Sequence, residues 1–167
     1  MHPADLLQAA RISVVNPAAS KKRVLEEAAH LLAAGADEPT AEQIFERLLE
    51  RERLGSTGLA GGVALPHARM PGVTDARGAF LRLAAPVEFD AMDGQPVDLV
   101  FALLVPEEAT EEHLQLLAGL ARLFSDNALC ARLRENDKPS AVPSILNGEA
   151  SSDAASGKGQ GSLRLPA

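Results

Sequence analysis

The sequence predicts an α/β protein with a mixed β-sheet flanked by α-helices on both faces, in a single domain. Two observations support this prediction. Amphipathic segments of helical period interleave with apolar, β-branched segments of strand type. In addition, residues 97–105 (VDLVFALLV) are apolar on both faces, which is typical of a central strand covered on two sides. The 167 residues, 46% of them hydrophobic, are enough for one domain with a substantial core.

The first part of the chain predicts one short strand and two helices. Residues 12–15 are rich in β-branched side chains and predict the strand. Ser20 is a suitable N-cap for the first helix, because its hydroxyl can accept from an amide of the first turn. Thr40 and Gln43 have the spacing of a capping box, which predicts a second helix that ends at Gly55.

The second part of the chain predicts two strands and two further helices. Residues 78–83 and 97–105 predict strands, and the Asp-Gly link between them is short enough to join antiparallel neighbours. Thr110 is the expected N-cap of a third helix, and Asp126 starts a fourth that runs to about residue 134. The side chains expected to face the core from the third helix are Leu114, Leu117, Ala118, Ala121 and Phe124.

The composition changes after residue 147. The segment GEASSDAASGKGQGSLRLPA is rich in Gly, Ser and Ala and has few apolar side chains to bury. We therefore expect the folded domain to occupy residues 1–147 and a disordered, low-complexity tail to occupy residues 148–167.

Charge and cysteine content narrow the class of partner. The net charge of −7 disfavours nucleic acid and anionic lipid, but it suits a protein with a basic docking surface. The single cysteine, Cys130, is typical of a reducing compartment. We identify no secretory signal, and the longest strongly apolar run, residues 99–105, is too short to cross a bilayer. We therefore expect a cytoplasmic protein that does not insert into membranes.

His67 is the strongest candidate for chemistry. It follows Pro66 and the glycine-rich stretch GSTGLAGG, whose flexible backbone can crowd around an anion. With a reference pKa of about 6.5, its imidazole is mostly neutral at pH 7. If an acceptor holds the ring N–H, the other nitrogen is presented as a nucleophile. The alternative is a loop histidine that makes two hydrogen bonds within the protein.

Other polar residues are candidates for binding an anion. His113 falls in the first turn of the third predicted helix, where unpaired N–H groups attract anions; otherwise it is a surface residue. Arg51 and Arg53 end the second helix and can reach a phosphate. The alternative is that they belong to a charged helix face that is exposed to solvent. Ser56 and Thr57 offer hydroxyl donors or merely cap a turn.

The sequence lacks the motifs of zinc-binding, nucleotide-binding and hydrolase sites. No cysteines or histidines have structural zinc spacing, so we expect no metal. The glycine stretch has neither the lysine of a P-loop nor a dinucleotide fingerprint, and we expect no cofactor. Ser56 and His67 with an aspartate would make a hydrolase triad, but no nucleophile-elbow pattern is present.

Two stretches together resemble the enzyme IIA domains of the bacterial phosphotransferase system, in the mannitol/fructose class and most closely its nitrogen-regulatory branch. They are residues 51–69 (RERLGSTGLAGGVALPHAR) and residues 86–124. The resemblance implies a mixed sheet flanked by helices. It also implies that His67 is phosphorylated, that His113 is the second active-site histidine, and that Arg51 is the active-site arginine.

The resemblance further implies a phosphoryl carrier that acts as a phosphotransferase component. His67 would receive the group from the histidine of a small carrier protein, HPr or NPr. Members of the nitrogen branch then regulate partner proteins according to phosphorylation state. The groups expected to hold the phosphoryl oxygens are His113, Arg51 and a phosphate-binding loop with Ser56, Thr57, Gly61 and Gly62.

The sequence alone leaves other functions open. One is a regulatory binding module that transfers no phosphate, and another is a sugar-transport IIA component that passes phosphate to a IIB domain. A hydrolase that depends on Ser56 is a third, less favoured hypothesis. Ala68 stands where relatives commonly have Gly, a conservative change unless the backbone there requires positive φ.

Overall fold

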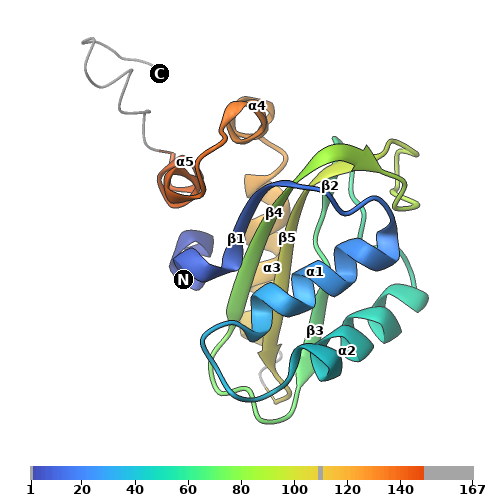
Figure 1. Cartoon of the computed structure of the whole chain (residues 1–167), viewed down its shortest axis with the longest axis vertical. Helices are drawn as coiled ribbons and strands as arrows, with labels where there is room; N and C mark the ends of the chain where they lie inside the picture. The colour runs from blue at the N-terminus through green and yellow to red at the C-terminus, as the bar shows by residue number, and fades with distance from the viewer. Residues whose placement is uncertain (1, 109–110, 149–167) are drawn as a thin grey trace.

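A computed structural model describes residues 2–108 and 111–148 of the chain (Figure 1). Its elements, in chain order, are η1 (Pro3–Leu6), η2 (Ala9–Arg11), β1 (Ile12–Asn16), α1 (Lys21–Ala33), α2 (Ala41–Arg53), β2 (Val63–Ala64), β3 (His67–Met70), β4 (Arg77–Val87), β5 (Val97–Pro106), α3 (Glu111–Leu123), α4 (Asn127–Glu135), η3 (Pro139–Ala141) and α5 (Val142–Leu146).

The described strands form one mixed sheet, as predicted. The order is β1-β4-β5-β2, and β3 also pairs with β5. β4 and β5 are antiparallel, whereas β1 runs parallel to β4 and both β2 and β3 run parallel to β5. Residues from Val63 to Met70 therefore follow the length of β5, and β3 lies at the edge of the sheet.

Helices cover both faces of this sheet, which confirms the predicted fold class (Figure 1). α1 and α2 lie on one face and α3 on the other, with α4, α5 and η1 toward one end. Val100 and Ala102 of β5 belong to the core under α1 and α2, while Phe101 and Leu103 belong to the core on the α3 side. Alternate residues of β5 thus fill two cores, which explains why the strand is apolar on both faces.

The caps predicted at Ser20 and Thr40 are present in the structure. The Ser20 hydroxyl accepts from the amide of Arg23 at 3.2 Å. Thr40 and Gln43 form both bonds of a capping box, at 2.9 and 3.2 Å. These caps define helix ends through contacts within a few residues, so they can be read from the sequence alone.

β2 and β3 are not predicted by the sequence, which places this stretch in a loop. Gly61 and Gly62 precede β2 with positive φ, and Pro66 separates β2 from β3. Both strands are short and owe their backbone partners to β5, more than 30 residues further along the chain. Local propensity carries little information about such non-local pairing.

The prediction of which α3 side chains face the core is partly wrong. Leu114 is 61% exposed and Ala118 is also exposed, whereas Leu120 is buried. The buried side of the helix instead begins at His113, which is only 6% exposed. The buried side of the helix is therefore offset by about one residue from the expected apolar stripe.

Two predictions concern residues outside the described ranges. These are the capping role of Thr110 and nearly all of the predicted tail, residues 149–167. Among the helices that the structure describes, none is both long enough and apolar enough to cross a membrane.

The Phe101 ring is fully buried and lies 6.0 Å, centroid to centroid, from the Phe124 ring. We predict that Phe101→Ala lowers the free energy of unfolding by about 3–5 kcal/mol, because the cavity cannot fully collapse. Urea denaturation followed by circular dichroism measures this. Met92→Ala, at a side chain that is 79% exposed, is the control and should change stability by less than about 0.5 kcal/mol. Equal losses would contradict the assignment of the core.

Candidate active site

A hollow of about 740 Å³ lies at the β3 edge of the sheet, where α2 and α3 approach from opposite faces. It brings together His67 from β3, His113 from α3 and Arg51 from α2. Its other lining residues are Arg47, Glu50, Arg53, Leu54, Ala68, Arg69, Leu103, Val105, Leu114 and Leu117. Three residues that the sequence singles out separately thus share one concave surface.

The backbone of β3 sets the orientation of His67. His67 pairs with Leu103, and the Leu103 amide donates to the Pro66 carbonyl at 2.9 Å. The ring nitrogen Nδ1 lies 2.8 Å from the Leu65 carbonyl oxygen. A carbonyl only accepts, so Nδ1 carries the proton of the neutral ring. The lone pair is then on Nε2, the nitrogen available for nucleophilic attack.

The surroundings of His67 favour the neutral ring. Burial lowers the pKa of His67 below its ordinary value, and the positive charges of Arg51 and Arg69 lower it further. The bond to Leu65 and the charge of Glu52 act in the opposite direction without reversing the shift. The ring is therefore uncharged at neutral pH, as a nucleophile must be.

His113 forms a buried part of the wall. Its Nδ1 atom is inaccessible and has no hydrogen-bond partner among the described residues. Burial lowers its pKa, and the charge of Arg69 adds to this effect against that of Glu112. A buried ring nitrogen without a partner is uncommon in a folded protein, and a catalytic role is one explanation for it.

The hollow is basic although the chain as a whole is acidic. Four arginines line it, Arg47, Arg51, Arg53 and Arg69, against one carboxylate, Glu50. Arg51 donates to the Gly55 carbonyl at 2.7 Å, which fixes one arm of its guanidinium and leaves other N–H groups for a ligand. This concentration of positive charge favours an anion.

Ser56 and Thr57 are bonded within the protein and are not part of the hollow's lining. The Ser56 hydroxyl donates to the Phe89 carbonyl at 2.6 Å and accepts from the Gly58 amide at 3.0 Å. Thr57 donates to the buried Glu52 carboxylate twice, from its amide at 2.8 Å and from its hydroxyl at 2.6 Å. These bonds fix the shape of the loop after α2.

Gly61 and Gly62 lie toward the other end of β5. Val63 pairs with Leu99 and His67 with Leu103, so the two pairs are four residues, or about 13 Å, apart along the strand. The Gly61 amide donates to Asp93 at 3.0 Å, and its carbonyl accepts from Arg134 at 2.7 Å. Both glycines have positive φ, near 80°, which accounts for the residue type.

Sequence reasoning missed the residues that support the site. Lys21 lies 2.9 Å from the Glu52 carboxylate and donates to the Phe89 carbonyl at 3.2 Å. This network joins the start of α1, the end of α2 and the loop between β4 and β5. Lys21 and Glu52 are 31 positions apart, and no local pattern connects them. Arg69 was also missed, because its relation to His67 depends on β3 being a strand.

Ala68 fits its position without strain. It lies inside β3, and the described non-glycine residues with positive φ are found elsewhere, at Val15 and Asp90. Its side chain is buried in the core under α1 and α2. Alanine is thus compatible with this backbone.

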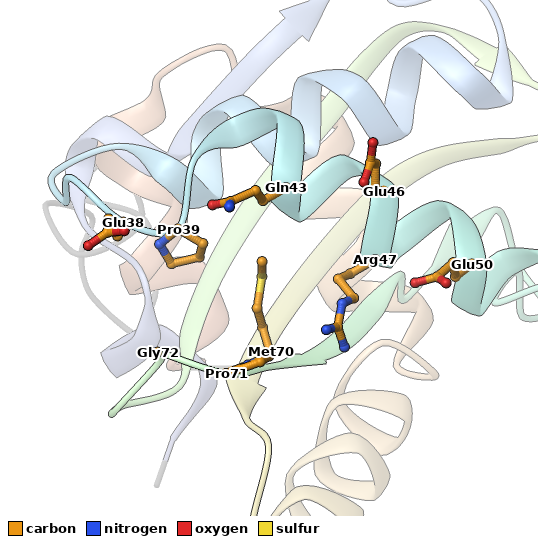
Figure 2. A pocket seen from close by; sticks show the side chains of 9 residues that line it. All are labelled: Glu38, Pro39, Gln43, Glu46, Arg47, Glu50, Met70, Pro71 and Gly72. Carbon is orange, nitrogen blue, oxygen red and sulfur yellow. The ribbon is translucent and has the colours of Figure 1, made fainter.

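A second hollow, of about 510 Å³, adjoins the first along α2 (Figure 2). The two share Arg47 and Glu50. In Figure 2, Arg47 extends from α2 toward β3, where its guanidinium donates to the Arg69 carbonyl at 3.5 Å. The remaining charged groups of this hollow are the carboxylates of Glu38 and Glu46. An acidic surface therefore borders the basic one.

No group of three or more metal-ligating side chains is found among residues 2–108 and 111–148. The side chains of the site are an imidazole with one unprotonated ring nitrogen, a buried second imidazole and several guanidinium groups. Together they suit the covalent capture of a small anion such as a phosphoryl group.

We predict that the pKa of His67 lies below its reference value of about 6.5. The ring ¹⁵N shifts followed against pH, with His67→Ala to identify the signal, measure it. Because the pKa of His113 is lowered too, the unfolded chain binds more protons than the folded one in mildly acidic solution. Stability should therefore fall as pH decreases from about 6.5 through the two folded-state pKa values. A pKa of 7 or more for His67 would contradict the site.

We also predict that Glu52→Gln lowers the free energy of unfolding by about 1–3 kcal/mol, because an amide cannot accept both Thr57 donors and pair with Lys21. Urea denaturation measures the loss. Glu46→Gln, on the exposed side of α2, is the matched control. Similar stability for both variants would show that the network does not stabilise the loop.

Comparison with known proteins identifies the family of this chain. The family described as "Phosphoenolpyruvate-dependent sugar phosphotransferase system, EIIA 2" matches residues 5–149. The chain is 50% identical over 135 residues to a nitrogen regulatory protein of Pseudomonas aeruginosa, covering 80% of this chain and 88% of that one. It is 46% identical over 130 residues to a nitrogen regulatory protein of Bradyrhizobium diazoefficiens, covering 76% and 82%.

A solved structure of a nitrogen regulatory protein has the same fold as this chain. The nitrogen regulatory protein IIA-Ntr from Neisseria meningitidis has a TM-score of 0.79 to this structure at 45% identity, covering 86% of this chain and 97% of that one. The mixed sheet and the helices on both its faces are therefore those of a known IIA fold. The chain belongs to the EIIA 2 family of the phosphoenolpyruvate-dependent sugar phosphotransferase system.

Proposed function

We propose that this protein is a phosphohistidine carrier of the nitrogen-regulatory kind, which accepts a phosphoryl group on Nε2 of His67 from an HPr- or NPr-type protein. The main support is the bond between His67 Nδ1 and the Leu65 carbonyl, which leaves Nε2 unprotonated in a hollow lined by arginines. The similarity to nitrogen regulatory proteins supports the regulatory role.

The transfer needs no metal ligand from this chain. The Nε2 lone pair of His67 attacks the phosphorus, and the P–N bond of the donor phosphohistidine breaks with its electron pair returning to the donor ring. If the other nitrogen of the donor ring carries a proton, that ring leaves as a neutral imidazole. The proton stays on His67 Nδ1, which donates it to the Leu65 carbonyl throughout, so no proton has to move.

The positive groups of the hollow stabilise the transition state. Phosphoryl transfer spreads charge over the peripheral oxygens, so catalysis depends on positioning and electrostatics. Arg51 offers the N–H groups that it does not use on Gly55, and His113 contributes its buried ring. The loop with Ser56, Thr57, Gly61 and Gly62 acts by positioning, since its bonds to Glu52, Phe89 and Asp93 hold it in place.

The rim of the hollow suits a protein donor. Leu54 and Leu114 line it from α2 and α3, and they are 85% and 61% exposed. Large exposed apolar side chains beside a concave site are typical of protein docking surfaces. The neighbouring acidic hollow with Glu38 and Glu46 offers complementary charge to a basic carrier.

The same geometry supports a regulatory output. Phosphorylation adds about −1.5 to −2 charges to a basic hollow. The positive field that a partner meets between α2 and α3 would then be strongly reduced, so partners can distinguish the two forms without a second active site. A hydrolase is not favoured, because the Ser56 hydroxyl is bonded to Phe89 and Gly58 and not to His67.

Radiolabelled phosphoenolpyruvate with enzyme I and the carrier tests the proposal. We predict stable incorporation of an acid-labile phosphate into the wild-type chain and none into His67→Ala. His30→Ala, at an exposed position of α1, is the matched control and should label normally. If the wild-type chain takes no label, it is a binding module without phosphoryl transfer. If His67→Ala still labels, another residue is the acceptor.

The same assay tests the two supporting residues. We predict that Arg51→Met and His113→Ala each slow labelling by about 100- to 1,000-fold, the range for losing one preorganised donor. Their thermal unfolding should be recorded in parallel, because His113 is buried. Unchanged labelling rates in a folded variant would remove that residue from the proposed transfer step.

A further inference from the structure

Arg69 points to the same side of the sheet as His67. The two are separated by one residue in β3, and side chains two apart in a strand share a face. The residues that alternate with them, Ala68 and Met70, are buried in the core under α1 and α2. His67 and Arg69 are therefore directed toward α3, where His113 lies.

The guanidinium group of Arg69 is available. It is exposed, and no hydrogen bond or ion pair of its side chain is found within the described residues. Its backbone is fixed, because Arg47 donates to its carbonyl and β3 pairs residue 69 with Val105. By contrast, Arg51 already uses one N–H on Gly55. Arg69 is thus a positioned but uncommitted cation in the hollow.

The charge of Arg69 acts on both imidazoles. It contributes to lowering the pKa of His67 and also that of His113, whereas Arg51 contributes only at His67. Arg69 therefore lies within electrostatic reach of both rings. A phosphoryl group bonded to His67 and directed toward His113 would lie within the same field.

We propose that Arg69 is a second phosphoryl-binding guanidinium, which holds peripheral oxygens during transfer to His67 and stays paired with the phosphohistidine afterwards. This inference rests on the proposed function and extends it to a residue outside the set of His67, His113 and Arg51. Arg51 approaches from α2 and Arg69 from β3, so the two can contact different oxygens. The planar fork of each suits such bidentate contacts.

The experiment compares Arg69→Met, Arg69→Lys and the control Arg122→Met. Arg122 is an exposed arginine of α3 that does not line this hollow. Labelling rates are measured against carrier concentration, which separates docking from transfer. We expect Arg69→Met to lower the maximal rate by about 10- to 100-fold with little change in the half-saturating carrier concentration. We expect Arg69→Lys to recover part of that rate and Arg122→Met to resemble wild type.

A titration without the carrier gives an independent readout. The pKa values of His67 and His113, followed by NMR, should both rise in Arg69→Met and stay unchanged in Arg122→Met. A purely structural role for Arg69 would not raise both values in a folded protein, and circular dichroism checks the fold of each variant.

The outcomes separate the two proposals. Arg69 is supported as a phosphoryl ligand if the wild type is labelled, Arg69→Met is labelled slowly, and the pKa values of His67 and His113 are raised in that variant. A labelled wild type with an Arg69→Met of equal maximal rate overturns this inference and leaves the carrier function intact. A wild type that takes no label overturns the carrier function, and the role of Arg69 with it.

Discussion

The parallel pairing of β3 with β5 is the constraint on which the site depends. It places His67 opposite Leu103 at the edge of the sheet, where the ring nitrogen Nδ1 bonds to the Leu65 carbonyl at 2.8 Å. That one bond selects the tautomer and therefore the nucleophilic nitrogen. The same pairing turns Arg69 to the face of His67 and closes the hollow against α3, so a change in register would disassemble the whole arrangement.

A buried ionic network supplies the second level of organisation. Glu52 accepts from Thr57 and pairs with Lys21, which also contacts the Phe89 carbonyl. Glu52 thus joins the end of α2 to the start of α1, and Lys21 extends the network to the loop between β4 and β5. The glycine-rich segment, flexible by composition, becomes a fixed support beside α2. The amides of Thr57, Gly58 and Gly61 bond to protein groups, whereas the cationic donors that line the hollow are arginines.

Charge is segregated on the surface around the site. The chain carries a net charge of −7, yet arginines dominate the hollow, and Leu54 and Leu114 form an apolar rim beside an acidic neighbour. In the proposed function, the basic hollow would capture the anion, and the apolar rim and the acidic neighbour would contact the donor protein. The modified and unmodified forms would then present different fields to partners.

The sequence by itself determined α1 to α4, the caps at Ser20, Thr40 and Asp126, and the central strand β5, because capping and apolar periodicity are local. It also identified His67, His113 and Arg51 as residues of interest. Only the tertiary structure decided that β2 and β3 are strands, that His113 is buried and that Arg69 faces the site. These features arise from contacts between residues far apart along the chain, and the free energy of such pairing depends on the partner and not on the segment itself.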